Sequence, residues 1–256
     1  MSCEEVEFTG QIYQVDPSGE REPQLMTLGK EGGRWESFAF DVRNRQAPRY
    51  FATEDHNKGT VRRFAPEIVD WENPWEQLHG PGKTDFLMIF PNATNDGGTF
   101  QWTDDIEAGR NNARALYPQT EGIDVYEGQM FFVCKQIKQM FVLNLDDGTY
   151  YNHTTNAGLF DGKPDQLARV LDDNKQLLYF TEEGGIDAGV HARDSFGRFY
   201  TIFESPVYED ETTGLSFSPD GKKMFVAYQD TGHLYMIWRS DGLPFHAGHL
   251  DVKFHN

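Results

Sequence analysis

The sequence lacks features that mark several protein classes. It has 2 cysteines in 256 residues, too few for a disulfide framework or a cysteine-rich zinc site. No apolar run approaches the roughly 20 residues that a membrane-spanning helix requires, so we expect no membrane insertion. The first residues carry neither the basic region nor the apolar core of a signal peptide. We therefore expect a cytoplasmic protein, or a secreted or periplasmic one if a leader has been removed.

Positive charge is scarce as well. The chain has 23 lysine and arginine residues against 41 aspartate and glutamate residues, which gives a formal net charge of −18. Such a surface repels phosphate backbones and anionic lipids, which argues against binding to nucleic acids or membrane surfaces. It is compatible with recruiting cations, although acidity that only keeps the protein soluble would explain the same charge.

Fingerprints of common enzymes are also missing, since the sequence contains no P-loop, no Gly-Xaa-Ser-Xaa-Gly elbow and no dinucleotide-binding motif. What the chain does have is 25 glycines and 20 phenylalanines. Many glycines and aromatic residues are typical of short strands that are joined by tight turns.

The stretch 213–230 shows the pattern that organises the chain. It predicts a strand at Leu215–Phe217, a tight turn at Pro219–Gly221 and a second strand at Lys223–Tyr228. In three of the four copies a third strand follows soon after the pair. The other copies of the two-strand pattern lie at 36–55, 121–135 and 165–183.

A strand module that recurs at intervals of roughly 40 to 85 residues indicates a β-propeller. We predict an all-β fold, with a single β-propeller domain over residues 1–256 and irregular loop insertions. The predicted number of blades is five, and four or six blades remain alternatives. A stacked β-sandwich is the main alternative. The strand expected at 11–15 would close the ring against the last blade, or the chain is a fragment of a longer propeller.

Segments between the modules are harder to assign. Residues 104–120 fit either a short helix ended by Pro118 or an irregular loop. We expect loops at 20–33, 67–84 and 184–194, and one more strand in the tail at 249–254.

Acidic residues fall into two columns when the four copies are aligned by their strands. In a propeller the start of each first strand and the end of each second strand lie on one face, so these side chains would crowd one mouth of the channel. The first column holds Glu36, Glu121, Asp165 and Thr213; the second holds Glu54, Lys135, Glu182 and Gln229, followed by Asp55, Gln136, Glu183 and Asp230.

Crowded carboxylates repel one another by about 1 kcal/mol per pair in water, and by more in a partly buried site. Raised carboxyl pKa values or bound cations would offset this repulsion. Ca²⁺ takes oxygen ligands, and the near absence of His and Cys from the columns favours such a hard cation over zinc. Solvated turn residues are the alternative explanation. The predicted metal ligands are Glu54, Glu121, Glu182, Glu211, Asp165 and Glu183.

His56 lies beside these acids and is the candidate for a catalytic base, although an exposed or capped histidine would have the same sequence context.

At these residues the chain resembles the PhoX-like family of propeller proteins, which includes calcium-dependent alkaline phosphatases. The resemblance extends from about residue 36 to residue 242. The motifs that carry it are Thr53-Glu54-Asp55, Glu121-Gly122, Thr181-Glu182-Glu183-Gly184, Glu211-Thr-Thr-Gly214, Phe217-Ser-Pro-Asp-Gly221, Phe225 and Gln229.

The resemblance implies a glutamate-held Ca²⁺ cluster, with iron in the phosphatases, and phosphate monoesters as anionic small-molecule substrates bound through the metal. Carried over, Glu54, Glu121, Glu182 and Glu211 would be ligands. The family places an arginine two residues before the glutamate matched by Glu121, whereas this chain has Gln119. The phosphatases also use a cysteine for iron, a role for which Cys3 has an unfavourable sequence context. The alternatives are a propeller that binds calcium or a partner without catalysis and, more remotely, a lactonase-type hydrolase.

Overall fold

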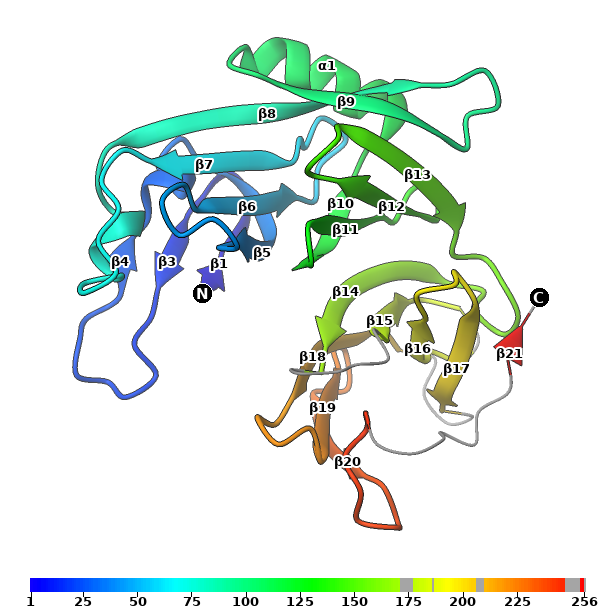
Figure 1. Ribbon diagram of the computed structural model, residues 1–256. Coiled ribbons are helices and arrows are strands. Elements are labelled where there is room, and N and C mark those ends of the chain that lie inside the picture. Colours follow the sequence, from blue (N-terminus) through cyan, green and yellow to red (C-terminus); the bar gives the residue numbers. More distant parts are fainter. Residues whose placement is uncertain (171–176, 186, 206–209, 247–253, 256) are drawn as a thin grey trace. The chain divides into compact units, whose positions relative to one another are not determined.

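The computed structural model describes residues 1–170, 177–185, 187–205, 210–246 and 254–255. It divides the chain into two compact units, Met1–His153 and Thr154–Asn256. Both units consist mainly of antiparallel sheets, so the predicted all-β class is confirmed (Figure 1). The single ring over 1–256 and its five blades stay predictions.

Unit 1 contains two four-stranded blades, each a meander in which every strand pairs with the next. The inner strands of the two blades, β5 and β10, lie side by side. The first blade comprises β5 (Gly33–Asp41), β6 (Arg49–Glu54), β7 (Arg62–Pro66) and β8 (Gly82–Pro91). The second comprises β10 (Thr120–Tyr126), β11 (Gln129–Cys134), β12 (Gln139–Asn144) and β13 (Thr149–Thr154).

Strand β9 (Gly97–Thr103) joins the two blades, because it pairs with β8 on one side and with β13 on the other. Helix α1 (Ile106–Leu116) packs on β8 and β9 (Figure 1). Asp105 caps the helix by accepting hydrogen bonds from the amides of Glu107 and Ala108 at 2.9 and 3.1 Å. Gly109 permits the close packing, since a Cβ there would lie 2.6 Å from the Cβ of Phe86. Of the two interpretations of 104–120, the short helix is the one confirmed, and it ends at Leu116, two residues before Pro118.

The N-terminal segment adds a strand to the first blade and a small sheet of its own. Strand β2 (Glu5–Gly10) pairs with β5, and the small sheet consists of β1 (Ser2–Cys3), β3 (Ile12–Gln14) and β4 (Gln24–Leu25). Two 3₁₀ turns, at Thr27–Gly29 and Glu76–Leu78, lie in the segments that we expected to be loops.

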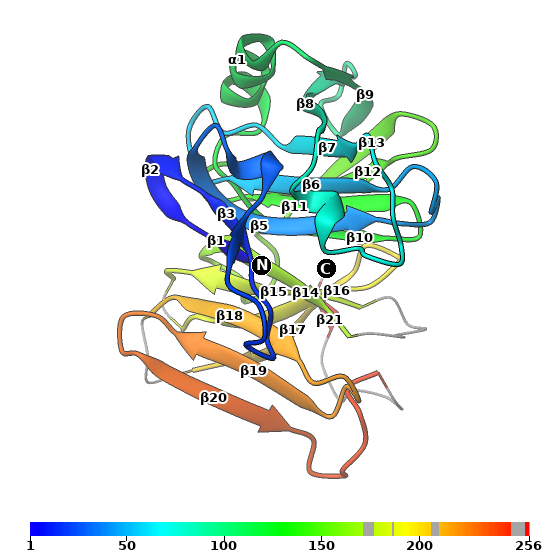
Figure 2. The same cartoon turned by 90° about the vertical axis from the view of Figure 1, so that its left-hand side faces the viewer.

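The described residues of unit 2 form one blade of four consecutive strands and one of three. The first comprises β14 (Lys163–Arg169), β15 (Leu178–Glu183), β16 (Gly189–Arg193) and β17 (Phe199–Glu204), with β21 (Phe254–His255) added at its edge. The second comprises β18 (Thr212–Phe217), β19 (Lys223–Tyr228) and β20 (His233–Trp238), which lie side by side in Figure 2.

The turn between β18 and β19 follows the sequence closely. Gly221 has φ of 65°, which a residue with a side chain adopts only with strain, and its amide bonds the carbonyl of Ser218 at 2.8 Å. The Ser218 hydroxyl donates to Asp220 at 2.6 Å and fixes the loop further. The turn predicted at Pro219–Gly221 is confirmed.

Three predictions about the strands need correction. The module has four strands in three of the blades and not three: strands were expected at 86–90 and 197–203, which are β8 and β17, whereas β13 and β16 were not expected. The loop expected at 184–194 contains β16. All five residues of β16 are buried, and Val190 is its one large apolar residue. The tail strand expected at 249–254 lies outside the described residues except for Phe254, which belongs to β21.

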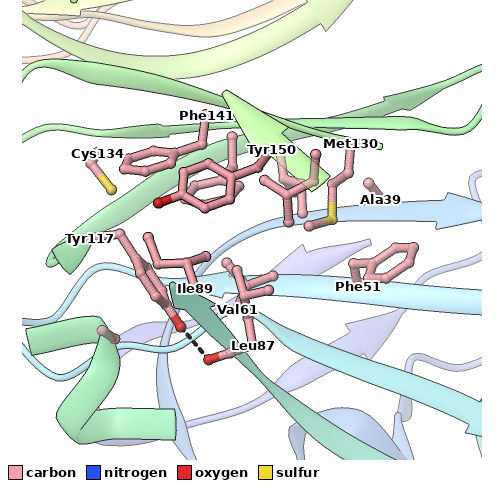
Figure 3. Packing of buried hydrophobic residues seen from close by; sticks show 14 residues of the cluster. Ala39, Phe51, Val61, Leu87, Ile89, Tyr117, Met130, Cys134, Phe141 and Tyr150 are labelled. Atoms are coloured by element: carbon pink, nitrogen blue, oxygen red, sulfur yellow. Dashed lines mark hydrogen bonds between the residues drawn. The ribbon is translucent and has the colours of Figure 1, made fainter. Parts of the chain in front are cut away.

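The main core of unit 1 lies between its two blades and helix α1. Phe132 and Phe141 stack with ring centroids 5.0 Å apart, and Tyr117 from the end of α1 packs edge-on against both. The Tyr117 hydroxyl donates to the carbonyl of Leu87 at 2.6 Å, which satisfies the one polar group that this ring brings into the core (Figure 3). A second cluster in unit 1 surrounds Trp35.

The core of unit 2 surrounds Tyr179, Val190 and Met224 and joins its two blades. The Phe-Phe and Tyr-Phe pairs of the second strands, Phe131–Phe132 and Tyr179–Phe180, are buried as expected. Among the described residues, no helix is long and apolar enough to span a membrane.

We expect Phe132→Ala to lower the free energy of unfolding by about 3 to 5 kcal/mol, because it leaves a cavity among stacked rings. Phe40→Ala is the matched control, since Phe40 is 55% exposed on a strand of the same unit, and it should cost well under half as much. Urea denaturation measures both values, and equal costs would contradict the packing described for unit 1.

Candidate functional site

Each inner strand carries a β-bulge near its start, which decides where the acidic side chains point. The pairings of β5 with β6, β10 with β11, β14 with β15 and β18 with β19 all shift by one residue there. A bulge redirects the side chain of the extra residue and kinks the strand. In the first three hairpins an acid begins the bulge, and in the fourth Gly214 does so: the acids are Glu36, Glu121 and Asp165.

Threonines before the second-strand glutamates stabilise two of these bulges. The hydroxyl of Thr53 accepts the amide of Ser37 at 3.1 Å, and that of Thr181 accepts the amide of Gln166 at 2.9 Å. A bulge leaves backbone groups without ladder partners, and a hydroxyl on the facing strand supplies one. The repeated Thr-Glu step thus has a structural reason.

A second pair of threonines links neighbouring blades within each unit. Thr120 bonds the backbone of Glu54 through its hydroxyl, which donates to the carbonyl at 3.1 Å and accepts from the amide at 3.2 Å. Thr212 makes the same two bonds to Glu182, at 3.2 and 2.9 Å. These bonds bring Glu54 close to the start of β10 in unit 1, and Glu182 close to the start of β18 in unit 2.

Glu54 and Glu121 therefore lie at one end of unit 1, and Glu182 and Glu211 lie at one end of unit 2. The convergence of all four on one channel concerns both units and stays a prediction. Strand pairing also corrects the sequence alignment by one residue. The structural equivalents of Glu54 and Glu182 are Cys134 and Tyr228, opposite Thr120 and Thr212, and not Lys135 and Gln229.

The bulges of unit 1 bring two carboxylates together. Carboxylate oxygens of Glu36 and Glu121 lie within 4.8 Å of each other, with Glu36 half-buried and Glu121 only 1% exposed. The ammonium group of Lys135 lies 2.8 Å from Glu121 and 2.8 Å from Asp55. Lys135 therefore compensates the charges of two buried acids, Glu121 and Asp55. Of the two neighbouring carboxylates, Glu36 is the less buried.

The charges of this cluster shift its pKa values in the directions that pairing requires. Burial opposes the charge on Lys135, but Glu121 and Asp55 outweigh it and raise the pKa of Lys135 above its usual range. Burial would likewise raise the pKa of Asp55, and the hydrogen bond from Lys135 lowers it instead. Lys135, which we aligned only as an exception among the acids, is the cation that holds this end of the unit together.

Glu54 has a different cation. Its Oε1 lies 3.1 Å from the guanidinium of Arg62, which is fully buried and stacks over the Trp35 ring at 4.4 Å. Among the described residues, Glu54 Oε2 is buried without a hydrogen-bond donor. One oxygen of this carboxylate thus remains for a further ligand.

Glu182, by contrast, is fully engaged by the protein. Its Oε1 accepts from the amides of Asp161 and Gly162 at 3.0 and 2.6 Å, and its Oε2 lies 3.3 Å from the Gly189 amide and 3.1 Å from His191 Nε2. The His191 ring is held on its other side by Thr201 at 3.1 Å. A cation bound to Glu182 would have to replace some of these contacts.

Arg62 and His191 occupy equivalent positions in their blades. Arg62 pairs with Ala52 and His191 pairs with Phe180, which are each two residues before the glutamate. Sequence reasoning missed both, because the third strands were not aligned with the glutamates. Each of these strands has a second basic residue, Arg63 or Arg193, so composition alone does not single out Arg62 and His191.

The other predicted site residues are placed as follows. Asp165 is 5% exposed and accepts a hydrogen bond from Thr181 at 3.3 Å. Glu183 pairs with Lys163 at 2.8 Å. Glu211 is half-buried, and its carbonyl accepts the amide of Gln229 at 2.9 Å.

His56 is half-buried with its ring edge-on to Phe8. Its Nδ1 accepts the amide of Lys58 at 3.1 Å, and burial lowers the pKa of the imidazole. The neutral ring then carries its proton on Nε2, which suits a hydrogen-bond donor better than a base.

Cys3 is the residue whose position the sequence could not show. Strand β1 lies beside β5, and burial together with the negative charge of Glu36 raises the pKa of Cys3 to about 11. The charge of Glu36 thus acts on the thiol, although 33 positions separate the two residues in the chain. Cys134 is buried in β11, as expected.

Comparisons with known proteins give the fold but no family. No family model matches the chain, and no curated protein sequence matches it. Among solved structures, PhoX of Pseudomonas fluorescens, determined in complex with vanadate as a transition-state analogue, superimposes with a TM-score of 0.73 at 17% identity. The match covers 93% of this chain and 59% of PhoX.

A chain of the nidogen/laminin complex superimposes with a TM-score of 0.59 at 13% identity, covering 90% of this chain and 72% of that one. The fold is thus that of a β-propeller similar to PhoX, and this chain spans about three fifths of the length of PhoX.

We expect Lys135→Met to lower the free energy of unfolding at pH 7 by about 3 kcal/mol, because Glu121 and Asp55 lose their shared cation. The folded-state pKa of Asp55 is depressed, so its contribution is present above its usual pKa of about 3.9 and is lost as pH falls through the folded value. The difference between variant and wild type should therefore shrink as the pH falls below the ordinary carboxyl pKa and through the depressed folded-state pKa of Asp55. Lys30→Met at an exposed position is the control; a pH-independent difference for Lys135→Met would contradict the pairing.

Proposed function

We propose that this chain binds hard cations at the acidic ends of its inner strands, Ca²⁺ first and iron second, and hydrolyses phosphate monoesters there. The observation that carries the proposal is the pair of carboxylates from Glu36 and Glu121, which converge within 4.8 Å on a fold similar to PhoX. In unit 1 the motifs Thr53-Glu54-Asp55 and Glu121-Gly122, which carry the resemblance to the PhoX-like family, fall at this same end.

The residues of unit 1 fit such a cation. Ca²⁺ binds oxygens at 2.3 to 2.6 Å, so two ligands of one ion lie up to about 5 Å apart. The oxygens of Glu36 and Glu121 satisfy this limit, and Glu54 Oε2 is a buried oxygen without a donor among the described residues. Iron binds cysteine as the thiolate, and the raised pKa of Cys3 works against that form, so iron is the less favoured cation here.

A bound cation would neutralise the phosphate and polarise its oxygens. The chain's own groups position the substrate: the Lys135 ammonium is a hydrogen-bond donor between Glu121 and Asp55, and His56 carries a proton at Nε2. Backbone amides already bond both oxygens of Glu182. Glu182 is therefore better suited to fix the loop at Asp161 and Gly162 than to bind a cation. Glu211, Asp165 and Glu183 stay predicted ligands of the same kind of cation in unit 2.

A second candidate is calcium binding without catalysis. Lys135 already compensates Glu121, and Gln119 stands where the phosphatases have an arginine. Both features weaken a phosphate site more than a cation site. The lactonase-type alternative gains no support from these contacts.

The test uses the full chain after treatment with a chelator. Adding Ca²⁺ should raise the melting temperature, because a ligand at 100 times its dissociation constant stabilises the native state by about 2.7 kcal/mol. Glu36→Gln and Glu121→Gln should each lose most of the calcium-induced increment, whereas Glu22→Gln at an exposed position should keep it. Elemental analysis of the untreated protein identifies the metal.

Hydrolysis of p-nitrophenyl phosphate with Ca²⁺ and iron then separates the two candidates. Turnover that the chelator abolishes supports the phosphoesterase, and calcium stabilisation without turnover supports binding alone. If the calcium-induced rise in melting temperature survives both glutamine substitutions, calcium does not bind at Glu36 and Glu121 and the proposed site in unit 1 is wrong.

A further inference from the structure

A cavity of about 420 Å³ opens at the other end of the two blades of unit 1, and the proposed metal site does not use it. It lies where β5 ends, β6 begins and the turn after β12 folds over, and Trp102 of β9 contributes to its wall. Strand β6 runs from Arg49 in the cavity to Glu54 at the acidic end, a distance of roughly 16 Å at 3.3 Å per residue. The two sites are therefore separate.

Three arginines line this cavity in a chain that is otherwise strongly acidic. Arg43, at the rim, pairs with Asp41 and Asp146 at 2.9 Å each. Arg63 pairs with Asp85 at 2.6 Å and lies over the Trp102 ring at 4.5 Å. These two guanidinium groups have carboxylate partners.

Arg49 is the exception. Its Nη1 donates to the carbonyls of Ala47 and Pro48 at 3.1 and 2.9 Å, which fixes the guanidinium at the cavity wall. Among the described residues, no carboxylate lies within 4.0 Å of it and its other N–H groups have no acceptor. Burial and the like charge of Arg63 lower the pKa of Arg49, so its positive charge is held at a cost.

We propose that this cavity binds a small organic anion whose carboxylate or phosphate head pairs with Arg49 and whose flat apolar part lies against Trp102 and Phe51.

The planar guanidinium matches the oxygens of carboxylate and phosphate groups, and charge-assisted bonds of this kind are stronger than neutral ones. Trp102 is half-buried and Phe51 is buried beside it, with ring centroids 5.8 Å apart, so an aromatic wall adjoins the unpaired charge. A volume of about 420 Å³ falls within the range of small-molecule sites. The rest of the surface repels anions, so binding depends on the local arginines.

The test titrates the full chain, kept in chelator so that the metal site is silent, with benzoate, phenylphosphonate and the neutral benzamide. Calorimetry and tryptophan fluorescence measure binding. At least one of the two anions should bind and raise the melting temperature, and benzamide should bind at least about tenfold more weakly. The comparison of benzoate with phenylphosphonate distinguishes a carboxylate from a phosphate head. Binding should also weaken as salt is added.

Arg49→Gln should weaken the binding of the preferred anion by at least about tenfold, and Arg114→Gln on the exposed face of α1 should leave it unchanged. Arg43→Gln at the rim, where loss of folding is not expected, should weaken it as well, because Asp41 and Asp146 then lose their cation. Trp102→Phe should remove the fluorescence change.

The proposal fails if neither anion binds, if benzamide binds as well as the anions, or if Arg114→Gln weakens binding as much as Arg49→Gln does. The comparison of charged and neutral ligands on the wild-type chain decides the matter even if Arg49→Gln does not fold. A failure here leaves the proposed metal site untouched, because the chelator excludes that site from the measurement.

Discussion

Buried carboxylates in this protein each require a positive or hydrogen-bonded partner, and the blades supply one for each in a different way. Glu121 and Asp55 share the ammonium of Lys135, Glu54 has the buried guanidinium of Arg62, and Glu182 has three amides and His191. An ionised carboxylate left alone in such a setting would be strongly destabilising, so these partners are a condition of folding. Only carboxylate oxygens that have no such partner remain available to bind a cation.

The bulges and the threonines determine where those oxygens lie. A bulge near the start of three of the inner strands, β5, β10 and β14, redirects an acidic side chain. Threonine hydroxyls satisfy backbone groups that the bulges expose, and others join neighbouring blades. The same short motif thus serves packing and chemistry together. Thr53 and Thr181 would be retained for stability even in a relative that bound no metal.

Charge is distributed unevenly along the blades of unit 1. Glu36, Glu54 and Glu121 gather where the inner strands begin, whereas Arg43, Arg49 and Arg63 line a cavity where β5 ends. Because strand β6 alone separates the two ends by roughly 16 Å, screening by salt makes them nearly independent. A net charge of −18 therefore describes the surface as a whole and conceals a local site of the opposite sign.

The sequence by itself determined the all-β class, the four hairpins and the positions of the acids, because strand alternation and turn residues act over a few neighbouring positions. It missed β13 and β16, whose mainly polar and small residues give no apolar strand pattern. It also could not show that Lys135, Arg62 and His191 meet the glutamates, since those contacts join different strands. Only the tertiary structure decided which carboxylates keep an oxygen for a cation, because burial and partner atoms arise from packing and have no local signal.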